Sequence, residues 1–263
     1  MPKLAANLSM MFNEVPFLDR FATAGAAGFR AVEFLFPYEH EPAVVAGKLR
    51  DAQLAQALFN MPPGDWNAGE RGIGALAGRE AEFAAGIDTA LTYARALDCP
   101  LVHPMAGFAA ADDERAITTY VANIRAAADA FAPAGKRIVL EPINHRDMPG
   151  YFLHTTAQAA ALIAIIDRPN VGLQLDLYHA QISEGDLDKK IRAFQPLTAH
   201  VQIAGNPARH EPDIGEVNYG YLLGVLDEIG YAGWVGCEYR PAGATVAGLG
   251  WAKPYLSSHR AAL

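Results

Sequence analysis

Ile138-Val139-Leu140-Glu141-Pro142-Ile143-Asn144-His145 carries the pattern from which the fold can be predicted. Its aliphatic and β-branched residues predict a buried strand, and the proline after Glu141 ends that strand. A carboxylate at the end of a buried strand is unfavourable unless it is paired or bound to a metal. Three later segments repeat this apolar run followed by an oxygen-bearing side chain: Val171–Asp176, Ala199–Gln202 and Trp234–Glu238.

Working outward, further apolar runs alternate with segments of helical periodicity. The other predicted strands are Leu4–Leu8, Ala31–Phe36, Leu54–Asn60 and Leu101–Met105. The predicted helices are Pro16–Ala27, Glu41–Asp51, Arg79–Leu97, Asp112–Phe131, Thr155–Ile166, Leu187–Phe194, Tyr219–Ile229 and a weaker one at Val246–Leu256. Most of the strands are too uniformly apolar to have a wet face, which predicts a parallel sheet covered by helices.

Eight strand–helix units in this length match an α/β protein with a closed (β/α)₈ TIM barrel, forming a single domain over residues 1–263. The alternative is an open doubly wound sheet. That fold calls for a glycine-rich phosphate turn after the first strand, and Asn7–Met11 contains no glycine.

The composition of the chain limits the molecules that it is expected to bind and the compartment in which it is expected to work. The net charge of -8 disfavours nucleic acid and anionic membranes. The N-terminus does not look like a signal peptide and no apolar run is long enough to span a bilayer, so we expect a cytoplasmic protein. Cys99 and Cys237 lack metal-binding spacing. Strand alternation turns Cys237 away from the face of Glu238, where we expect a packed thiol.

The active site of such a barrel lies at the carboxyl ends of its strands. The oxygen-bearing residues expected to converge there are Glu141, Asp176, Gln202 and Glu238. Each alone could cap a helix or pair with an arginine, but four in register favour one divalent cation. Oxygen ligands select Mg²⁺ or Mn²⁺ over zinc, and the sequence does not decide between those two ions.

An anionic substrate would need a positive clamp, because three carboxylates around a dication leave a net negative charge. Arg209, after the seventh strand, and Arg71, beside Trp66 after the third strand, are the candidates. The acidic residues that could instead pair with these arginines are Glu70, Glu211 and Asp213. His179 follows the sixth strand, and His103 is either a core histidine or a substrate contact.

Two glutamates facing each other across a metal suit proton transfer next to a carbonyl group. One of Glu141 and Glu238 would remove a carbon-bound proton and the other would return a proton at the adjacent carbon. The metal would polarise the carbonyl and stabilise the enediolate. We therefore expect aldose–ketose isomerisation or epimerisation of a small polyhydroxy compound.

At these residues the chain resembles the sugar isomerase–epimerase superfamily of xylose isomerase-like TIM barrels, which includes endonuclease IV. Within it, the chain is most similar to the hydroxypyruvate isomerases and the 2-oxo-tetronate isomerases. The stretches that carry the resemblance are Ala6–Met10, Val32–Tyr38, Pro63–Glu70, Glu141–Asn144 and Gly233–Tyr239. The resemblance implies that Glu141, Asp176, Gln202 and Glu238 bind the metal and that the two glutamates are the acid–base pair. His179 matches a histidine that contacts substrate oxygens in related ketose epimerases.

The expected substrate is a small hydroxy-oxo acid. We expect interconversion of hydroxypyruvate and tartronate semialdehyde, with 2-oxo-tetronate and 3-oxo-tetronate as the alternative, since some stretches resemble one branch and some the other. Ketose 3-epimerases carry histidine where Gln202 stands, and endonuclease IV needs a histidine cluster for three zinc ions. These two activities, and a non-catalytic sugar-acid binder, are the remaining alternatives. The sequence leaves open whether the chain forms a homo-oligomer.

Overall fold

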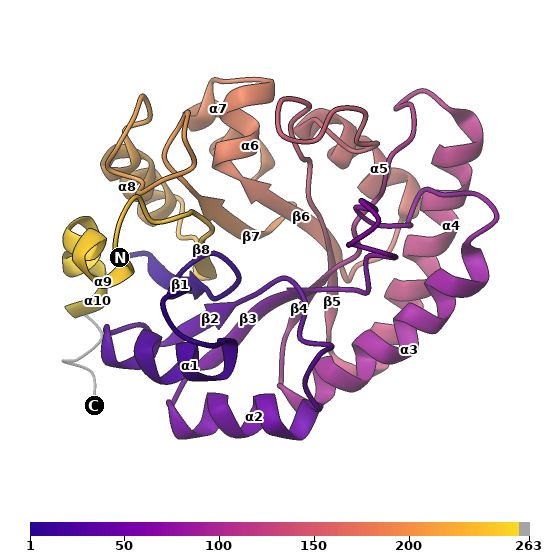
Figure 1. Ribbon diagram of the computed structural model, residues 1–263. Coiled ribbons are helices and arrows are strands. Elements are labelled where there is room, and N and C mark those ends of the chain that lie inside the picture. The colour runs from indigo at the N-terminus through magenta and orange to yellow at the C-terminus, as the bar shows by residue number, and fades with distance from the viewer. Residues whose placement is uncertain (258–263) are drawn as a thin grey trace.

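Eight parallel strands close into a barrel in which each strand pairs with the next and β8 pairs with β1. The computed structural model describes residues 1–257, and Figure 1 shows the helices arranged around the outside of the barrel. The predicted (β/α)₈ barrel, a single domain, is thereby confirmed over these residues. The last six residues of the predicted domain, 258–263, lie outside the described residues.

The strands are β1 (Lys3–Asn7), β2 (Ala31–Glu33), β3 (Ala55–Asn60), β4 (Leu101–His103), β5 (Arg137–Leu140), β6 (Val171–Asp176), β7 (Thr198–Ile203) and β8 (Trp234–Cys237). The helices are α1 (Phe17–Ala26), α2 (Pro42–Asp51), α3 (Glu80–Ala96), α4 (Glu114–Phe131), α5 (Thr156–Ile166), α6 (Leu177–Ser183), α7 (Leu187–Phe194), α8 (Tyr219–Glu228), α9 (Thr245–Gly248) and α10 (Lys253–Ser257), with short 3₁₀ turns η1 (Ala132–Ala134) and η2 (Leu249–Ala252).

The predicted boundaries agree with these bounds to within one to three residues. β6 and α7 have the predicted limits, and Thr155 caps α5 by accepting a hydrogen bond from the Gln158 amide. β2 ends earlier than predicted, at Glu33, because the Leu35 amide bonds the Ser9 hydroxyl instead of a neighbouring strand. The weak C-terminal helix is divided into α9, η2 and α10.

One helix was not predicted. α6 begins directly after β6, and Asp176 is its N-cap residue. Asp176 Oδ1 accepts hydrogen bonds from the backbone amides of Tyr178 at 2.7 Å and His179 at 3.3 Å. An aspartate whose side chain satisfies the first amides of the next turn is a recognised helix-start signal, and it could have identified α6 from the sequence.

Alternation along the strands separates two kinds of environment. On β1, Leu4 and Ala6 pack in the large apolar cluster between the barrel and its helices. Ala5 belongs instead to a small separate cluster with Ala31 and Ala57, which we place inside the barrel. Cys237 is buried in the large cluster, as predicted from its position next to Glu238. The strand ends nearest the site carry buried polar residues such as Asn7, Glu33 and Asp176.

Within residues 1–257, no helix combines the length and the apolar character that crossing a bilayer requires.

Candidate active site

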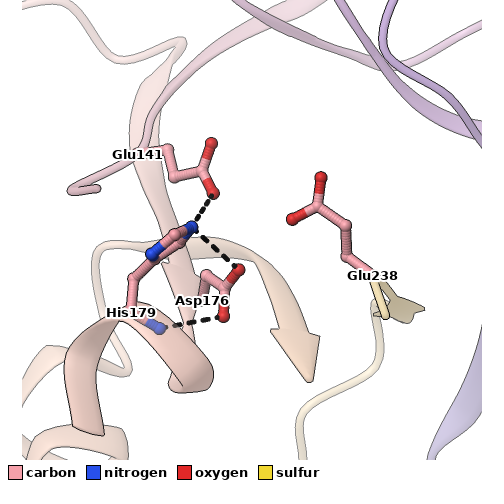
Figure 2. A group of neighbouring side chains, drawn as sticks. All are labelled: Glu141, Asp176, His179 and Glu238. Carbon is pink, nitrogen blue, oxygen red and sulfur yellow. Dashed lines mark hydrogen bonds and ion pairs between the residues drawn. The ribbon is translucent and has the colours of Figure 1, made fainter. Parts of the chain in front are cut away.

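Four buried side chains meet at the carboxyl ends of β5, β6 and β8. Ligand-type atoms of Glu141, Asp176, His179 and Glu238 all lie within 4.8 Å of one another. Figure 2 shows Glu238 facing the other three across a gap. Among residues 1–257 this is the only group of three or more histidine, cysteine or acidic side chains close enough to share an ion. The three-zinc arrangement expected of an endonuclease IV-like site therefore has no counterpart in the described part of the chain.

The strand ends position the carboxylates. Glu141 follows the last residue of β5, and Pro142 after it turns the chain away from the sheet. Glu238 follows β8, and its amide donates to the Ile203 carbonyl of β7 at 3.1 Å. Asp176 uses Oδ1 to cap α6, which leaves its buried Oδ2 without a hydrogen bond in the described structure. An unbonded buried carboxylate oxygen aimed into an acidic cluster is a suitable metal ligand.

The pKa values of the carboxylates also favour a bound cation at this cluster. Burial, with the nearby charges of Glu238 and Asp176, raises the pKa of Glu141 well above its ordinary value. Burial raises the pKa of Glu238 to about 8, although Arg209 opposes the shift. Burial likewise raises the pKa of Asp176. These carboxylates repel one another in a desolvated site, so a dication would stabilise their ionised forms. The donor set, mostly hard oxygens, fits Mg²⁺ or Mn²⁺.

His179 is held in one tautomer by Asn144. The Asn144 side-chain oxygen accepts the Asp147 amide at 2.8 Å, so its Nδ2 faces His179 Nδ1, at 2.6 Å. The backbone amide of Asn144 also donates to Nδ1, at 3.4 Å. An Nδ1 that accepts these bonds places the ring proton on Nε2. His179 Nε2 lies 3.7 Å from Asp176 Oδ2 and 3.9 Å from Glu141 Oε1, so it can donate a hydrogen bond into the site.

His103 is buried on β4 and has Nδ1 3.3 Å from Glu141 Oε2. Burial lowers the pKa of His103 to about 3, so its ring is neutral at pH 7. Neither ring nitrogen forms a regular hydrogen bond with residues 1–257. The buried ring thus stands beside Glu141, and a direct contact with a bound molecule stays a prediction.

The two candidate arginines lie in different environments. Arg209 reaches into the cluster, with Nη2 2.7 Å from Glu238 Oε2 and 3.7 Å from Asp176 Oδ2. Arg71 stacks on Trp66, 3.9 Å from the ring centroid, and donates only to backbone carbonyls of Trp66 and Glu70. The Glu70 carboxylate, expected as one alternative partner, pairs with Arg79 instead.

Among residues 1–257, Arg71 therefore forms no ion pair, and its charge remains available to an anion. Arg71 and Trp66 line a cavity of about 1460 Å³ that also contains Glu141, His179, Arg209 and Glu238. A cavity of this size accommodates a three-carbon or a four-carbon acid.

Gln202 lies level with Asp176 on the neighbouring strand β7. Its Nε2 donates to Glu33 Oε1 at 2.9 Å, and its Oε1 accepts from Gln174 Nε2 at 2.6 Å. A carbonyl oxygen has two acceptor positions, so Oε1 retains one for a cation. The assignment of Gln202 as a ligand stays a prediction.

The sequence interpretation missed three polar residues that support this site: Asn7, Glu33 and Asn144. Asn7 and Glu33 are the last residues of β1 and β2. The predicted strands continue to Leu8 and Phe36, so neither residue stands at a predicted strand end, where the expected ligands lie. Asn144 follows β5 within the opening motif, but nothing in the sequence indicates that it contacts His179.

The sequence of this chain is similar to those of known isomerases along nearly its whole length. Residues 21–255 match the family model described as xylose isomerase-like TIM barrel. The 2-oxo-tetronate isomerase of Cupriavidus necator is 54% identical, with 97% of this chain and 99% of that protein covered. The hydroxypyruvate isomerase of Escherichia coli is 44% identical, with 97% of this chain and all (100%) of that protein covered.

Solved structures agree with the fold. The structure named AP endonuclease, family 2, from Brucella melitensis superposes with a TM-score of 0.95 at 53% identity, covering 97% of this chain and 99% of that chain. An L-ribulose 3-epimerase superposes with a TM-score of 0.80 at 19% identity, covering 99% and 96%, which supports the fold alone. The chain therefore belongs to the xylose isomerase-like TIM barrel family and is an isomerase of the group that contains these 2-oxo-tetronate and hydroxypyruvate isomerases.

Proposed function

We propose that the protein is a metal-dependent isomerase that interconverts 2-oxo-tetronate and 3-oxo-tetronate by moving the carbonyl group between C2 and C3, the same proton-transfer chemistry as aldose–ketose isomerisation. The observation that carries the proposal is the convergence of Glu141, Asp176 and Glu238 at one end of the barrel. The identity of 54% to a 2-oxo-tetronate isomerase, against 44% to a hydroxypyruvate isomerase, favours the four-carbon acid. This reverses the order expected from the sequence, and hydroxypyruvate remains the second candidate substrate because one carbon contributes little to pocket selectivity.

Glu141, Asp176, Gln202 and Glu238 would hold one Mg²⁺ or Mn²⁺ ion. When bound, this ion supplies positive charge that polarises the substrate carbonyl and stabilises the enediolate. The support from the described residues is the unbonded Asp176 Oδ2 and the raised pKa values of the three carboxylates.

Glu141 and Glu238 would move the proton. They approach the cavity from β5 and β8, so a substrate bound between them presents adjacent carbons to both carboxylates. One glutamate takes the carbon-bound proton while the other protonates the neighbouring carbon, and the two exchange roles when the reaction runs backwards. Burial of both groups shields the reactive enediolate from side reactions with bulk water.

Arg71 and His179 would orient the substrate. Of the two candidate arginines, Arg71 is the one available to a substrate carboxylate, because Arg209 is already paired with Glu238. The Nε2 proton of His179 would donate to a substrate oxygen near Asp176. Trp66 would contribute a wall of the pocket, and His103 would act from behind that wall, beside Glu141.

The proton-transfer mechanism can be tested with a substrate deuterated at the carbon that loses its proton. Each of the two acids is assayed with Mg²⁺ and then Mn²⁺, and the product is analysed by mass spectrometry. We expect isomerisation with loss of deuterium to water, and higher kcat/KM for the four-carbon acid. Glu238→Gln should still bind substrate while turnover falls by roughly 10²-fold or more. Complete retention of label in the product would exclude the two-glutamate mechanism.

A further inference from the structure

Glu33 is a fully buried carboxylate inside the barrel, below the site and not part of the proposed ligand set. Its Oε1 accepts hydrogen bonds from Asn7 Nδ2 at 3.0 Å and Gln202 Nε2 at 2.9 Å. Its Oε2 lies 2.7 Å from His200 Nε2. One side chain on β2 therefore contacts residues of both β1 and β7.

The Glu33 side chain extends from β2 across the barrel interior to β7, and it can do so only because the residues beside it are small. β2 and β7 are separated by β1 and β8, and Gly236 on β8 is in register with Gln202 on β7 and with Ala5 on β1. A Cβ atom at Gly236 would lie between 2.3 and 2.5 Å from the carboxylate atoms of Glu33. The glycine leaves the space that the carboxylate occupies, so a larger residue there would displace Glu33.

Two residues that donate hydrogen bonds to Glu33, Asn7 and Gln202, belong to or contact the proposed metal ligands. Asn7 Nδ2, which donates to Glu33, also lies 3.4 Å from Glu238 Oε1. Because Gln202 gives its Nε2 to Glu33, its Oε1 must point away from that carboxylate. Glu33 thus selects the orientation of the Gln202 amide and holds the asparagine that contacts Glu238.

Packing alone does not account for a carboxylate at this position. TIM-barrel interiors are usually filled by apolar side chains, and burying a charge carries a large desolvation penalty. An apolar residue of similar volume would fill the space without that penalty. The three donors around Glu33 offset part of the penalty, and two of them belong to residues that face the site.

We propose that Glu33 is a positioning residue that orients Gln202 and Glu238 for binding the divalent cation. This inference rests on the metal site of the proposed function. Partners that orient metal ligands without touching the ion typically contribute a factor of about 10 to 100 in metal affinity. Loss of the Glu33 carboxylate should therefore weaken metal binding by a factor in that range.

The test measures Mn²⁺ affinity directly, by titration calorimetry or from the electron paramagnetic resonance of free Mn²⁺, with no substrate present. Glu33→Gln keeps the shape of the side chain but replaces one acceptor oxygen with a donor amide. We expect its Kd for Mn²⁺ to rise by about 10-fold to 100-fold. Asn170→Ala is the matched control, because it removes hydrogen bonds to the Ala128 and Lys136 carbonyls at the opposite end of β6. It should lower Tm while leaving the Kd unchanged.

A second pair of variants keeps the test decisive if Glu33→Gln does not fold. His200→Leu removes the donor to Glu33 Oε2, whereas His200→Gln keeps an N–H donor at a similar distance from the backbone. Mn²⁺ binding should be weakened in the leucine variant and retained in the glutamine variant.

The inference is overturned if Glu33→Gln, or His200→Leu where it alone folds, binds Mn²⁺ as tightly as the unsubstituted protein. A different result separates the two proposals. If the unsubstituted protein itself binds neither Mn²⁺ nor Mg²⁺, the metal site of the proposed function is wrong, and the role given to Glu33 is overturned with it.

Discussion

Arg209 and Glu238 form a largely buried ion pair, with the arginine side chain 13% exposed, in which Nη2 of the arginine lies 2.7 Å from Oε2 of the glutamate. The same nitrogen lies 3.7 Å from Asp176 Oδ2. A cation supplied by the chain therefore rests against two of the carboxylates that we propose as metal ligands. Because of this contact, Arg209 influences the ionisation of Glu238 as well as any anion in the cavity.

Arg209→Ala should accordingly lower kcat as well as raise KM. Truncating one partner of a buried charge pair costs about 2–5 kcal/mol, so we expect kcat/KM to fall by roughly a hundredfold or more. Steady-state kinetics with metal in excess would measure both parameters, and circular dichroism would check the fold. An increase in KM with kcat unchanged would instead indicate that Arg209 only binds the substrate acid.

Arg71→Ala should mainly raise KM, because, of the two candidate arginines, Arg71 is the one with no ion-pair partner among residues 1–257. A charge-assisted hydrogen bond contributes about 1.5–3 kcal/mol, which predicts a 10-fold to 100-fold increase in KM. Arg71→Lys should recover only part of the loss, since lysine cannot form the bidentate contact. Arg168→Ala is the control, because that exposed arginine pairs with Asp129 outside the cavity. An unchanged KM in Arg71→Ala would remove Arg71 from the site.

Asn144→Asp should change the tautomer of His179. An aspartate oxygen accepts the Nδ1 proton that asparagine excludes, so Nε2 loses the proton that it directs toward Asp176. We expect kcat to fall by roughly 10²-fold, a loss of the kind that follows a wrong histidine tautomer elsewhere. Asn144→Leu keeps the backbone donor and should lose less. The ¹⁵N chemical shifts of His179 would report the tautomer, and an unshifted Nε2–H signal in Asn144→Asp would contradict this account.

The stability of the metal-free protein should fall as pH rises from about 6.5 to 8. Burial raises the folded-state pKa of Glu141, Asp176 and Glu238, the last to about 8. In this window the folded protein therefore keeps protons that the unfolded chain has already lost. One fully titrating group contributes a slope of about 1.4 kcal/mol per pH unit. The lowered pKa values of His103 and His179 act below about pH 6.5, outside the window.

Urea unfolding in a chelator at several pH values would measure this slope. A bound Mg²⁺ would replace the retained protons, so its stabilising effect should be greater at pH 8 than at pH 6.5. A stability that does not change with pH in the chelator would mean that the carboxylates are not buried together as described.

Much of the architecture was predictable from the sequence because the information is local. Apolar runs such as Val171–Asp176 predict strands buried on both faces, and only a helix-covered parallel sheet buries such strands. Glu141, Asp176 and Glu238 occur at or directly after strand ends, so closing the barrel brings them together without any further specification. Predicted ends differ by a few residues because the last turn of an element depends on side chains from elsewhere, as with Ser9 and β2.

The sequence by itself therefore determined the barrel and the carboxylates at its rim, since both follow from residue type and position along each strand. Only the tertiary structure decided the partners of those carboxylates. Arg209 and Arg71 look alike in the sequence, yet one is paired with Glu238 and the other is stacked on Trp66. Glu33 and His200 are 167 positions apart and meet only because the barrel closes over Gly236. Such contacts depend on side-chain direction across strands that are distant in sequence, which local periodicity does not encode.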